Sequence, residues 1–293
     1  MPAAISHYLL AQKVYNALKE DVEIEKDAFF WGTQGPDFFF THRIFPWQRG
    51  ESFKKYGGKL HSAPPSETLG KMREYLQRHP QDKTARDYVL GFLCHYAFDS
   101  TAHPFVNCGA RLLHEQLERS TIGTCHNEIE ASLDTILLRY ETAQLPSEIR
   151  LTSLIPKNQA VIDAMARLYH EVILGVFSKD IPEAAIRQAC LDCRTAFSLL
   201  TDRTGLKRQL IARLERKKAP RATSHIIPLT EEGDYDWANI LCGEWQWPMD
   251  SDEVHTESFF ELYEQAVLLS QRLIKGFLDG EDLFLMTRDK PFA

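Results

Sequence analysis

Apolar side chains recur every three or four residues along most of the chain, which is the spacing of one face of an α-helix. In residues 5–20 this face is formed by Leu9, Leu10, Val14 and Leu18. No segment shows the alternation of apolar and polar residues that marks a half-buried strand. The pattern therefore predicts an all-α fold, a multi-helix bundle with helices at residues 5–20, 22–31, 66–78, 84–103, 124–141 and 255–278.

Three local features set expected boundaries in the first half of the chain. Ser6 is placed to cap the first helix, which puts His7 in its first turn. Pro104 disfavours the α conformation at His103, so the helix that begins near residue 84 is expected to end there. Residues 41–60 are expected to form a loop.

The C-terminal half is also helical in pattern but carries fewer reactive side chains. One apolar stripe runs from Val161 to Phe177. A second stripe consists of Leu206, Leu210, Ile211 and Leu214. It ends in the basic run 213–218, which we interpret as a solvated helix C-terminus, where cations are favoured.

Residues 219–253 form a long loop that contains several Pro and three Trp residues. A loop of this length within a compact domain is usually functional or disordered, and the Trp residues argue against disorder. We expect the loop to lie over the helical body, where it could border the functional cleft or serve only as a structural wrap.

The bulk composition fits a chain with a substantial core. The 293 residues are 44% hydrophobic, and we expect one domain over 1–293, with a metal-ligand half at 1–142 and a helical support half at 143–293. The net charge of −7 gives no sign of a nucleic-acid-binding surface. The first residues show no signal peptide, so a cytoplasmic location is expected, with at most peripheral membrane contact.

The six cysteines are expected to stay reduced, as is usual in a large intracellular chain. Cys190 and Cys193 form a single CxxC within a helical run. Because Ile186 and Phe197 share that face of the helix, we interpret both cysteines as core residues with no redox or metal-binding role.

The candidate chemistry is concentrated between residues 91 and 130. His95, Asp99 and His103 follow one another at intervals of four residues, so they share one helix face, and His126 and Glu130 repeat this interval. A single His on a helix is most often a polar residue on a solvated face. Five imidazole and carboxylate groups in register instead indicate a metal site between two helices. A donor set of nitrogen and oxygen without thiolate suits catalytic zinc.

Asp37 lies in a rigid turn that ordinary linkers lack. Gly32 and Gly35 permit unusual dihedral angles, and Pro36 restricts the backbone just before Asp37. The neighbouring aromatic residues are either core or a rim that contacts a quaternary ammonium headgroup; these are Phe38, Phe39, Phe40, Tyr56 and Tyr96. The other histidines are interpreted as surface or loop residues: His42, His79, His114, His170, His225 and His255.

In order along the chain, these residues resemble the motifs of the zinc-dependent phospholipase C family, which is related in fold to the single-strand nucleases of the P1 type. The matching elements are His7, GPD at 35–37, His61, HYAFD at 95–99, His103 and HNEIE at 126–130. They cover residues 1 to about 140. The resemblance implies an all-α fold that holds two or three zinc ions in a cleft.

The resemblance also implies a ligand set for each ion. The first would be held by Asp37, His61, His95 and Asp99, and the second by His103, His126 and Glu130. The third would be held by His7, a bridging Asp99 and the N-terminal amine. Secreted members usually have a longer interval between the residues that correspond to Asp99 and His103. They also expose their N-terminal residue by signal cleavage; here, removal of Met1 would leave the amine of Pro2 five positions before His7.

The implied activity is phosphodiester hydrolysis by metal-activated water, with cleavage of a phospholipid headgroup as the expected reaction. Asp37 or Glu130 would act as general base as well as ligand, and Asp134 would support the ligands from one turn further along the helix. Two alternatives are a nuclease or phosphatase that acts on nucleotides or single-stranded nucleic acid, and a non-catalytic metal-stabilised binding module. The acidic balance counts against a nucleic-acid partner.

Overall fold

The computed structural model describes residues 3–20 and 22–292. Within these ranges every regular element is helical, and a single isolated β-bridge joins Trp245 and His255. The predicted all-α fold is therefore confirmed. The α-helices are α1 (Ala4–Leu18), α2 (Lys26–Gly32), α3 (Lys55–Ser62), α4 (Pro65–Arg78), α5 (Lys83–Gln116), α6 (Ile122–Thr142), α7 (Gln159–Phe177), α8 (Glu183–Leu200), α9 (Leu206–Glu215), α10 (Phe259–Leu278) and α11 (Leu283–Thr287). Short 3-10 helices are η1 (Asp37–Thr41), η2 (Pro146–Glu148), η3 (Leu151–Ser153) and η4 (Thr223–His225).

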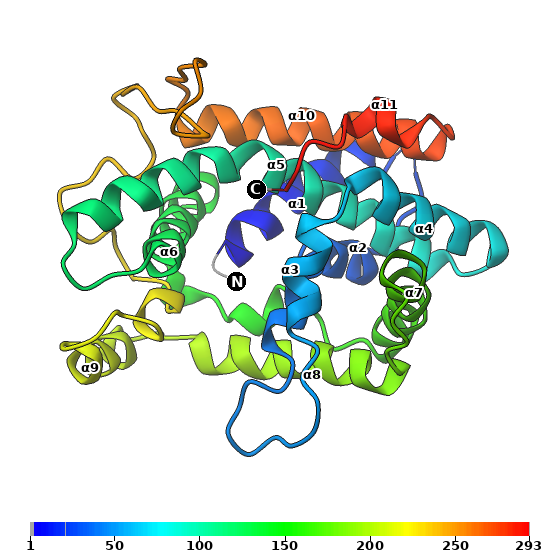
Figure 1. Ribbon diagram of the computed structural model, residues 1–293, viewed down its shortest axis with the longest axis horizontal. Coiled ribbons are helices and arrows are strands. Elements are labelled where there is room, and N and C mark those ends of the chain that lie inside the picture. The colour runs from blue at the N-terminus through cyan, green and yellow to red at the C-terminus, as the bar shows by residue number, and fades with distance from the viewer. Residues whose placement is uncertain (1–2, 21, 293) are drawn as a thin grey trace.

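The longest helix, α5, crosses the centre of the molecule and contacts α1, α2, α6, α7 and α10 (Figure 1). Every residue from Asp87 to Ser100 is buried, so this part of the helix is covered on all sides. Its backbone approaches α2 most closely where Gly91 meets Gly32, and a Cβ atom on Gly32 would lie 2.8 Å from the Cα atom of Gly91. Gly32 therefore permits close helix contact, and not an unusual dihedral angle as predicted.

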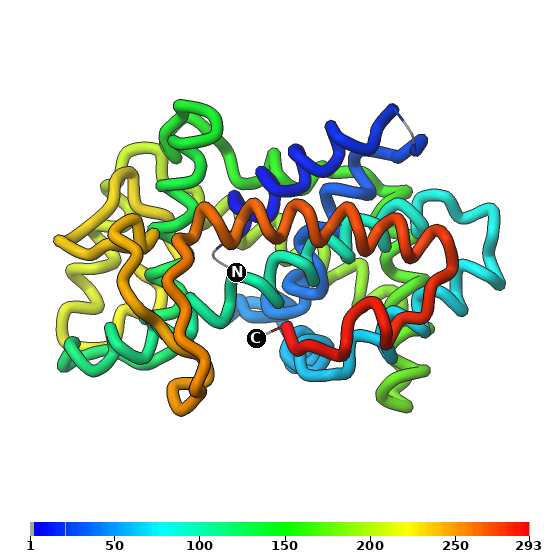
Figure 2. Tube along the Cα trace, turned by 90° about the horizontal axis from the view of Figure 1, so that it is seen from above, coloured from blue at the N-terminus to red at the C-terminus, as the bar shows by residue number. Residues whose placement is uncertain are grey.

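Helix α10 lies lengthwise beside α1, and both contact α5 (Figure 2). It begins at Phe259, later than predicted, because Ser258 and Glu261 form a reciprocal capping box. After α11, which contacts α4, the chain returns to α5. There Phe292 is fully buried, with its ring in contact with those of Phe92 and Tyr96.

The prediction that the central helix ends at His103 is wrong, because α5 continues through Pro104 to Gln116. A proline in a helix interior costs about 3 kcal/mol relative to alanine. Beyond it, however, α5 buries Val106, Cys108 and Leu113. Full burial of each large apolar side chain contributes about 1.5–3 kcal/mol, so tertiary burial outweighs the local preference of the proline.

The predicted loop at residues 41–60 is also partly wrong, since α3 begins at Lys55. Glycines at 57 and 58 weaken the local helix signal. The helix forms because Tyr56 and Leu60 are buried and because Gly57 lies against the ring of Phe40, which a Cβ atom would approach to 2.9 Å. As a result, His61 projects from a helix and not from a loop.

The two apolar stripes of the C-terminal half differ in their surroundings. The stripe in α7 is core: Val161, Leu168 and Val172 are all fully buried. The stripe in α9 faces solvent, with Leu206, Leu210 and Leu214 exposed. Both stripes lie on helices, as predicted, but apolar periodicity alone does not show whether another element covers that face of the helix.

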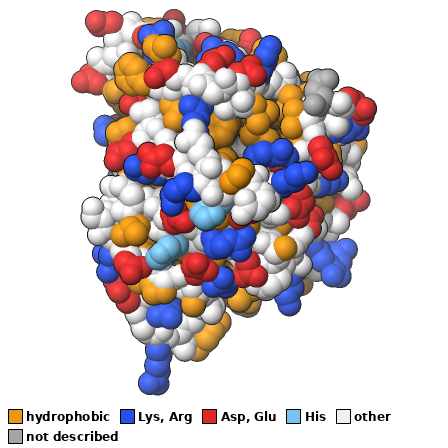
Figure 3. Space-filling model, turned by 90° about the vertical axis from the view of Figure 1, so that its right-hand side faces the viewer, with side chains coloured by type: hydrophobic (Ala, Val, Ile, Leu, Met, Phe, Trp, Pro, Cys, Tyr) orange, Lys and Arg blue, Asp and Glu red, His pale blue; other side chains and the backbone are white. Residues whose placement is uncertain are grey.

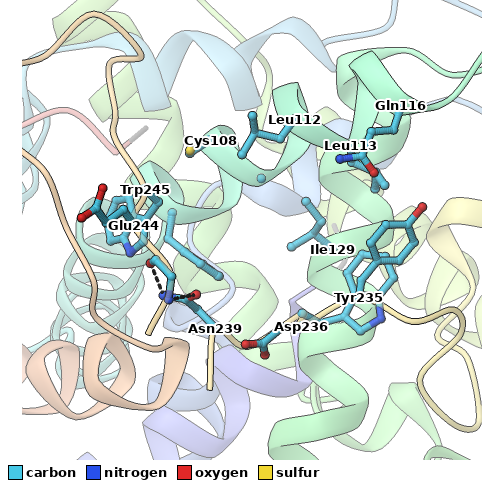
Figure 4. A pocket seen from close by; sticks show the side chains of 14 residues that line it. Cys108, Leu112, Leu113, Gln116, Ile129, Tyr235, Asp236, Asn239, Glu244 and Trp245 are labelled. Carbon is cyan, nitrogen blue, oxygen red and sulfur yellow. Dashed lines mark hydrogen bonds between the residues drawn. The ribbon is translucent and has the colours of Figure 1, made fainter. Parts of the chain in front are cut away.

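The long loop packs over the helical body, as predicted, through the buried side chains of Trp237 and Trp245. Together with α5 and α6 it forms an open, largely apolar pocket of about 230 Å³, bordered by Cys108, Leu112 and Ile129 (Figure 4). All six cysteines are free, and Cys190 and Cys193 are buried in α8. Their interpretation as core residues is confirmed.

No helix in the described residues is long and apolar enough to cross a membrane. The surface at the right-hand end in Figure 1 is mixed in charge: Lys and Arg side chains alternate with Asp and Glu over this face, without a large area of one sign (Figure 3).

Replacing Pro104 with Ala is expected to raise the free energy of unfolding by about 1–3 kcal/mol, because it removes a proline from a helix interior. Urea denaturation of the metal-free protein measures this. Pro65→Ala is the matched control, since Pro65 lies in the first turn of α4, where proline is tolerated. If Pro65→Ala raised the free energy of unfolding as much as Pro104→Ala, the position of the proline within its helix would not be the cause of the gain in stability.

Candidate metal centre

The structure brings all eight predicted ligand side chains into one region between α1, η1, α3, α5 and α6. Their donor atoms form three groups, and within each group the atoms lie within 4.8 Å of one another. The groups are His7, His95 and Asp99; Asp37, His61 and His95; and His103, His126 and Glu130. Their membership is similar to the three sets that the family resemblance implies, but Asp99 is grouped with His7 and His95 alone, and His95 is shared between two groups.

The carboxylate of Asp99 lies at the centre of the cluster. Its Oδ2 atom is 3.2 Å from His95 Nε2 and 3.3 Å from His61 Nε2. Its Oδ1 atom is 3.2 Å from His7 Nε2 and 3.7 Å from His103 Nε2. The two oxygens therefore face different groups of imidazoles, which is the geometry that a bridging ligand requires.

The third group joins α5 to α6. Glu130 Oε1 lies 3.2 Å from His126 Nε2 and 3.4 Å from His103 Nε2. His103 reaches this position because α5 continues beyond Pro104, which keeps His103 on the same face as His95 and Asp99. The short interval between Asp99 and His103 is thus compatible with a place in the cluster.

Three of the histidines are oriented by oxygen atoms that lie near Nδ1, on the side of the ring away from the cluster. The Nδ1 atom of His61 lies 2.8 Å from the carbonyl oxygen of Gly57, and that of His103 lies 2.8 Å from the carbonyl oxygen of Phe292. His126 Nδ1 is 3.0 Å from Asn107 Oδ1. When Nδ1 donates to an oxygen, the lone pair is on Nε2, which here faces the cluster. This arrangement is typical of metal-binding histidines.

The donor set fits zinc. The closest donor atoms lie 3.2–3.4 Å apart, and a tetrahedron with zinc–ligand distances of 2.0–2.1 Å has edges of about 3.3 Å. Three carboxylates meet here, and no Lys or Arg lines the cleft or the adjoining cavity among the described residues. Buried anions need compensating cations, and divalent metal ions would provide them.

The pKa values of the side chains in the cluster also show that the buried carboxylates favour positive charge nearby. Burial lowers the pKa of His61, but hydrogen bonds and charges from Asp37 and Asp99 outweigh burial and raise it to about 10. Burial also lowers the pKa of His103, yet Asp99 and Glu130 raise it to about 9. Burial raises the pKa of Asp37, but His61 lowers it to about 2. In the absence of metal, His61 and His103 therefore carry protons at neutral pH, because the neighbouring carboxylates favour positive charge there.

Asp134 holds the first turn of α1, which carries His7. Its carboxylate accepts hydrogen bonds from the backbone N–H groups of Ile5 and Ser6 at 3.2 and 2.7 Å, and from the Ser6 hydroxyl at 2.7 Å. A carboxylate at a helix N-terminus is favoured by the helix dipole. The prediction that Ser6 caps α1 is wrong, because the helix begins at Ala4 and Asp134 of α6 supplies the acceptor.

Asp37 is positioned by a turn that lies directly on the ring of His95. Gly35 has a φ angle of 50°, and a Cβ atom there would be 2.1 Å from the His95 ring. The Tyr88 hydroxyl donates to the Gly35 carbonyl oxygen at 2.9 Å. Glycine is thus required at position 35 both for its backbone conformation and for contact with a predicted ligand.

A cleft of about 530 Å³ opens over the cluster. Its floor is polar and includes Asp37, His61, His103, His126 and Glu130. Its walls are largely apolar and include Phe40, Ile44, Phe45, Ala196, Leu199 and Leu200. Of the five aromatic residues considered as a rim, Phe40 alone lines this cleft; Phe38, Phe39, Tyr56 and Tyr96 are core.

Several residues at the site were not predicted. His225 of η4 lines the cleft beside Asn127, a position that its interpretation as a surface or loop residue did not include. His42 lies in a turn after η1, as expected of a loop residue, but its side chain is fully buried and accepts a hydrogen bond from the Phe53 N–H. Asn107, four positions after His103, could have been noticed as a possible partner on the same helix face. Phe292 lies 189 residues from His103, and no sequence signal connects the two.

Met1 and Pro2 lie outside the described residues, so the Pro2 amine as a ligand of a third zinc stays a prediction. The ligand roles of the other side chains also stay predictions, although their positions are now known. The expected single domain over 1–293 stays a prediction as well. The cleft nevertheless includes α8 and η4, which belong to the half that was expected to provide only helical support.

Comparison with known proteins gives one match. The family model for zinc-dependent phospholipase C matches residues 6–179, which is more than half of the chain. No curated protein matches the chain. No solved structure matches it either. The match spans every predicted ligand from His7 to Glu130 and agrees with the all-α fold and the donor set. The chain therefore belongs to the zinc-dependent phospholipase C family and is a zinc-dependent phosphodiester hydrolase.

Proposed function

We propose that the protein hydrolyses the headgroup phosphodiester of a phospholipid in the cleft above the three donor groups. The observation that carries this proposal is the contrast between the polar floor and the apolar walls of one cleft. The floor suits an anionic phosphodiester beside metal ions, and the walls suit the glycerol and acyl part of a lipid. A phospholipid presents both chemistries next to each other.

The proposed ligands are His7, Asp37, His61, His95, Asp99, His103, His126 and Glu130. Zinc bound by them would polarise the phosphoryl oxygens and lower the pKa of water. The protein contributes the orientation of each imidazole through Gly57, Asn107 and Phe292, and holds the buried carboxylates ionised. The predicted two or three ions agree with the number of donor groups.

Asp37 is the better candidate for the general base. Its side chain is 18% exposed and that of Glu130 is 7% exposed, so Asp37 is more accessible from the cleft. Its pKa of about 2 keeps it ionised at neutral pH. Asp37 would take a proton from the attacking water as the new bond to phosphorus forms. The ester bond to the leaving alcohol then breaks, and that oxygen takes up the proton.

The cleft favours a lipid over a nucleic acid. Binding of a single strand usually combines a basic groove with aromatic platforms for the bases. Here no Lys or Arg lines the cleft among the described residues, and most wall residues are aliphatic. A nuclease or nucleotide phosphatase therefore remains the weaker alternative, as predicted from the composition.

Protein purified without chelators is expected to contain about two to three equivalents of zinc, one for each donor group. It should hydrolyse a soluble aryl phosphodiester and micellar phosphatidylcholine faster than single-stranded DNA. Chelation should abolish both activities, and added zinc should restore them. Elemental analysis and product release measure these outcomes. Faster turnover of DNA than of lipid would contradict the proposed substrate, and a protein that takes up no zinc would contradict the ligand assignment.

Asp99→Asn is expected to lose bound zinc and to lower kcat by about a thousandfold or more, because Asp99 contacts four imidazoles. Asp134→Asn is the matched control on the neighbouring helix. It should retain zinc and lose at most about tenfold in zinc affinity, since Asp134 contacts only the first turn of α1. Equal zinc loss in the two variants would show that the ligand and support roles are assigned wrongly.

Removal of residues 291–293 is expected to weaken zinc binding about 10- to 100-fold, because it removes the carbonyl oxygen that orients His103 and the ring that contacts His61. Competition with a chelator of known affinity measures the effect. A chain that lacks only residue 293 is the control and should bind zinc as the full chain does. Unchanged affinity after the longer deletion would exclude a positioning role for Phe292.

A further inference from the structure

Helix α9 presents its apolar side to solvent. Leu206, Leu210 and Leu214 follow at intervals of four residues, so they share one face. They are 65%, 61% and 75% exposed. The helix has one buried residue, Arg208, which lies on the opposite face. In most surface helices the leucines face the core and the arginines face water; in α9 this order is reversed.

The reversed orientation is held by specific contacts. Arg208 pairs with Glu128 and Glu232 and donates to the carbonyl oxygens of Thr223 and Ile226 at 2.7 Å. A buried arginine with several acceptors fixes the rotation of its helix. The leucines therefore face outward because the opposite face is anchored, and not because the helix is loosely attached.

The contacts of α9 also connect this helix to segments that line the cleft. Thr223 and Ile226 flank His225, which lines the cleft. At the start of α9, Lys207 donates to the carbonyl oxygen of Leu199 at 2.7 Å, and Leu199 is both exposed and part of the cleft wall. The exposed leucines thus belong to an element fixed to two segments that form the cleft.

The segment around α9 is strongly basic. Residues 203–221 contain eight Lys and Arg residues and one Glu, within a chain of net charge −7. Arg213, Arg216, Lys217, Lys218 and Arg221 are exposed and form no ion pair with any residue that the structure describes. The opposite end of the molecule is mixed in charge (Figure 3). Positive charge is therefore concentrated on the element that carries the exposed leucines.

A second exposed apolar segment lies beside the cleft. Ile44 and Phe45 line the cleft, Ile44 is exposed, and Phe45 stacks on the exposed ring of Trp47 with centroids 4.9 Å apart. Tryptophan is enriched where proteins meet the interface of a bilayer. The 44–47 segment, which lines the cleft, and α9, which is fixed to two other segments that line it, both carry exposed apolar residues.

We propose that α9 is an interfacial helix that docks the protein on an anionic phospholipid surface, with Leu206, Leu210 and Leu214 inserted among the lipids. The surrounding Lys and Arg side chains would meet the anionic headgroups. This inference rests on the proposed function, because a lipid substrate is reached at such a surface. A two-fold contact between two copies would pair one basic α9 segment with another, whereas an anionic bilayer offers the opposite charge. The exposed leucine face of α9 favours a lipid bilayer over a nucleic acid as the partner.

The test measures sedimentation of the full-length, zinc-loaded protein with vesicles, on ice. The vesicles contain phosphatidylcholine alone or an equal mixture with phosphatidylserine. Leu210→Gln should lower the partition constant for mixed vesicles about tenfold, and Lys217→Gln should lower it about fivefold. Leu268→Gln is the matched control, since Leu268 is 67% exposed on α10, away from α9. It should leave partitioning unchanged.

Hydrolysis of a soluble aryl phosphodiester separates this inference from the proposed function. Leu210→Gln should leave that rate unchanged while it lowers the rate on mixed vesicles. Equal partitioning of wild type, Leu210→Gln and Leu268→Gln would overturn the inference. Concentration-dependent self-association that Leu210→Gln abolishes, without vesicle binding, would overturn it in favour of a second copy. Failure of the wild type to hydrolyse either substrate would instead contradict the proposed function and leave the partition result as a separate measurement.

Discussion

The structure depends on the burial of three carboxylates among five imidazoles. Asp99 and Glu130 are almost inaccessible, and burial of such charges is costly unless cations compensate for it. Imidazoles that carry protons provide part of the compensation, which is why the pKa values of His61 and His103 are raised to about 10 and about 9. Zinc ions would replace these protons with a larger and fixed positive charge. Metal binding is therefore expected to be coupled to proton release and to the stability of the surrounding helices.

The fold supplies what such a cluster needs, namely rigid elements on all sides. The 87–100 stretch of α5 is covered completely, so His95 and Asp99 have little freedom to move. Gly35 brings the Asp37 turn against the His95 ring, and Asp134 fixes the helix that carries His7. Each of these contacts joins a predicted ligand to a different element. The precision of the cluster is therefore a property of how several helices pack, and no single motif contains it.

This explains which parts of the site could be predicted. The intervals between His95, Asp99 and His103, and between His126 and Glu130, place each set on one helix face, and helix geometry alone predicts this from the sequence. The continuation of α5 through Pro104 depends on apolar burial beyond the proline, which a local rule does not include. His225 and Phe292 reach the site through long-range folding, and their neighbours in sequence carry no metal-ligand pattern. Local helix spacing and the family resemblance indicate the predicted ligands, whereas the groups that orient them and form the cleft walls depend on tertiary contacts.

The outward face of α9 poses a related problem of interpretation. Its leucines have the spacing of a core helix and its basic run has the composition of a solvated terminus, so each signal alone has an ordinary explanation. Only the position of Arg208 decides between a buried and an exposed stripe, because the arginine and the leucines occupy opposite faces. A net negative protein is repelled by an anionic bilayer at long range, and a localised basic segment can reverse this repulsion over about one Debye length. The structure places that segment beside the cleft, where attraction to the surface would also orient the catalytic opening toward its substrate.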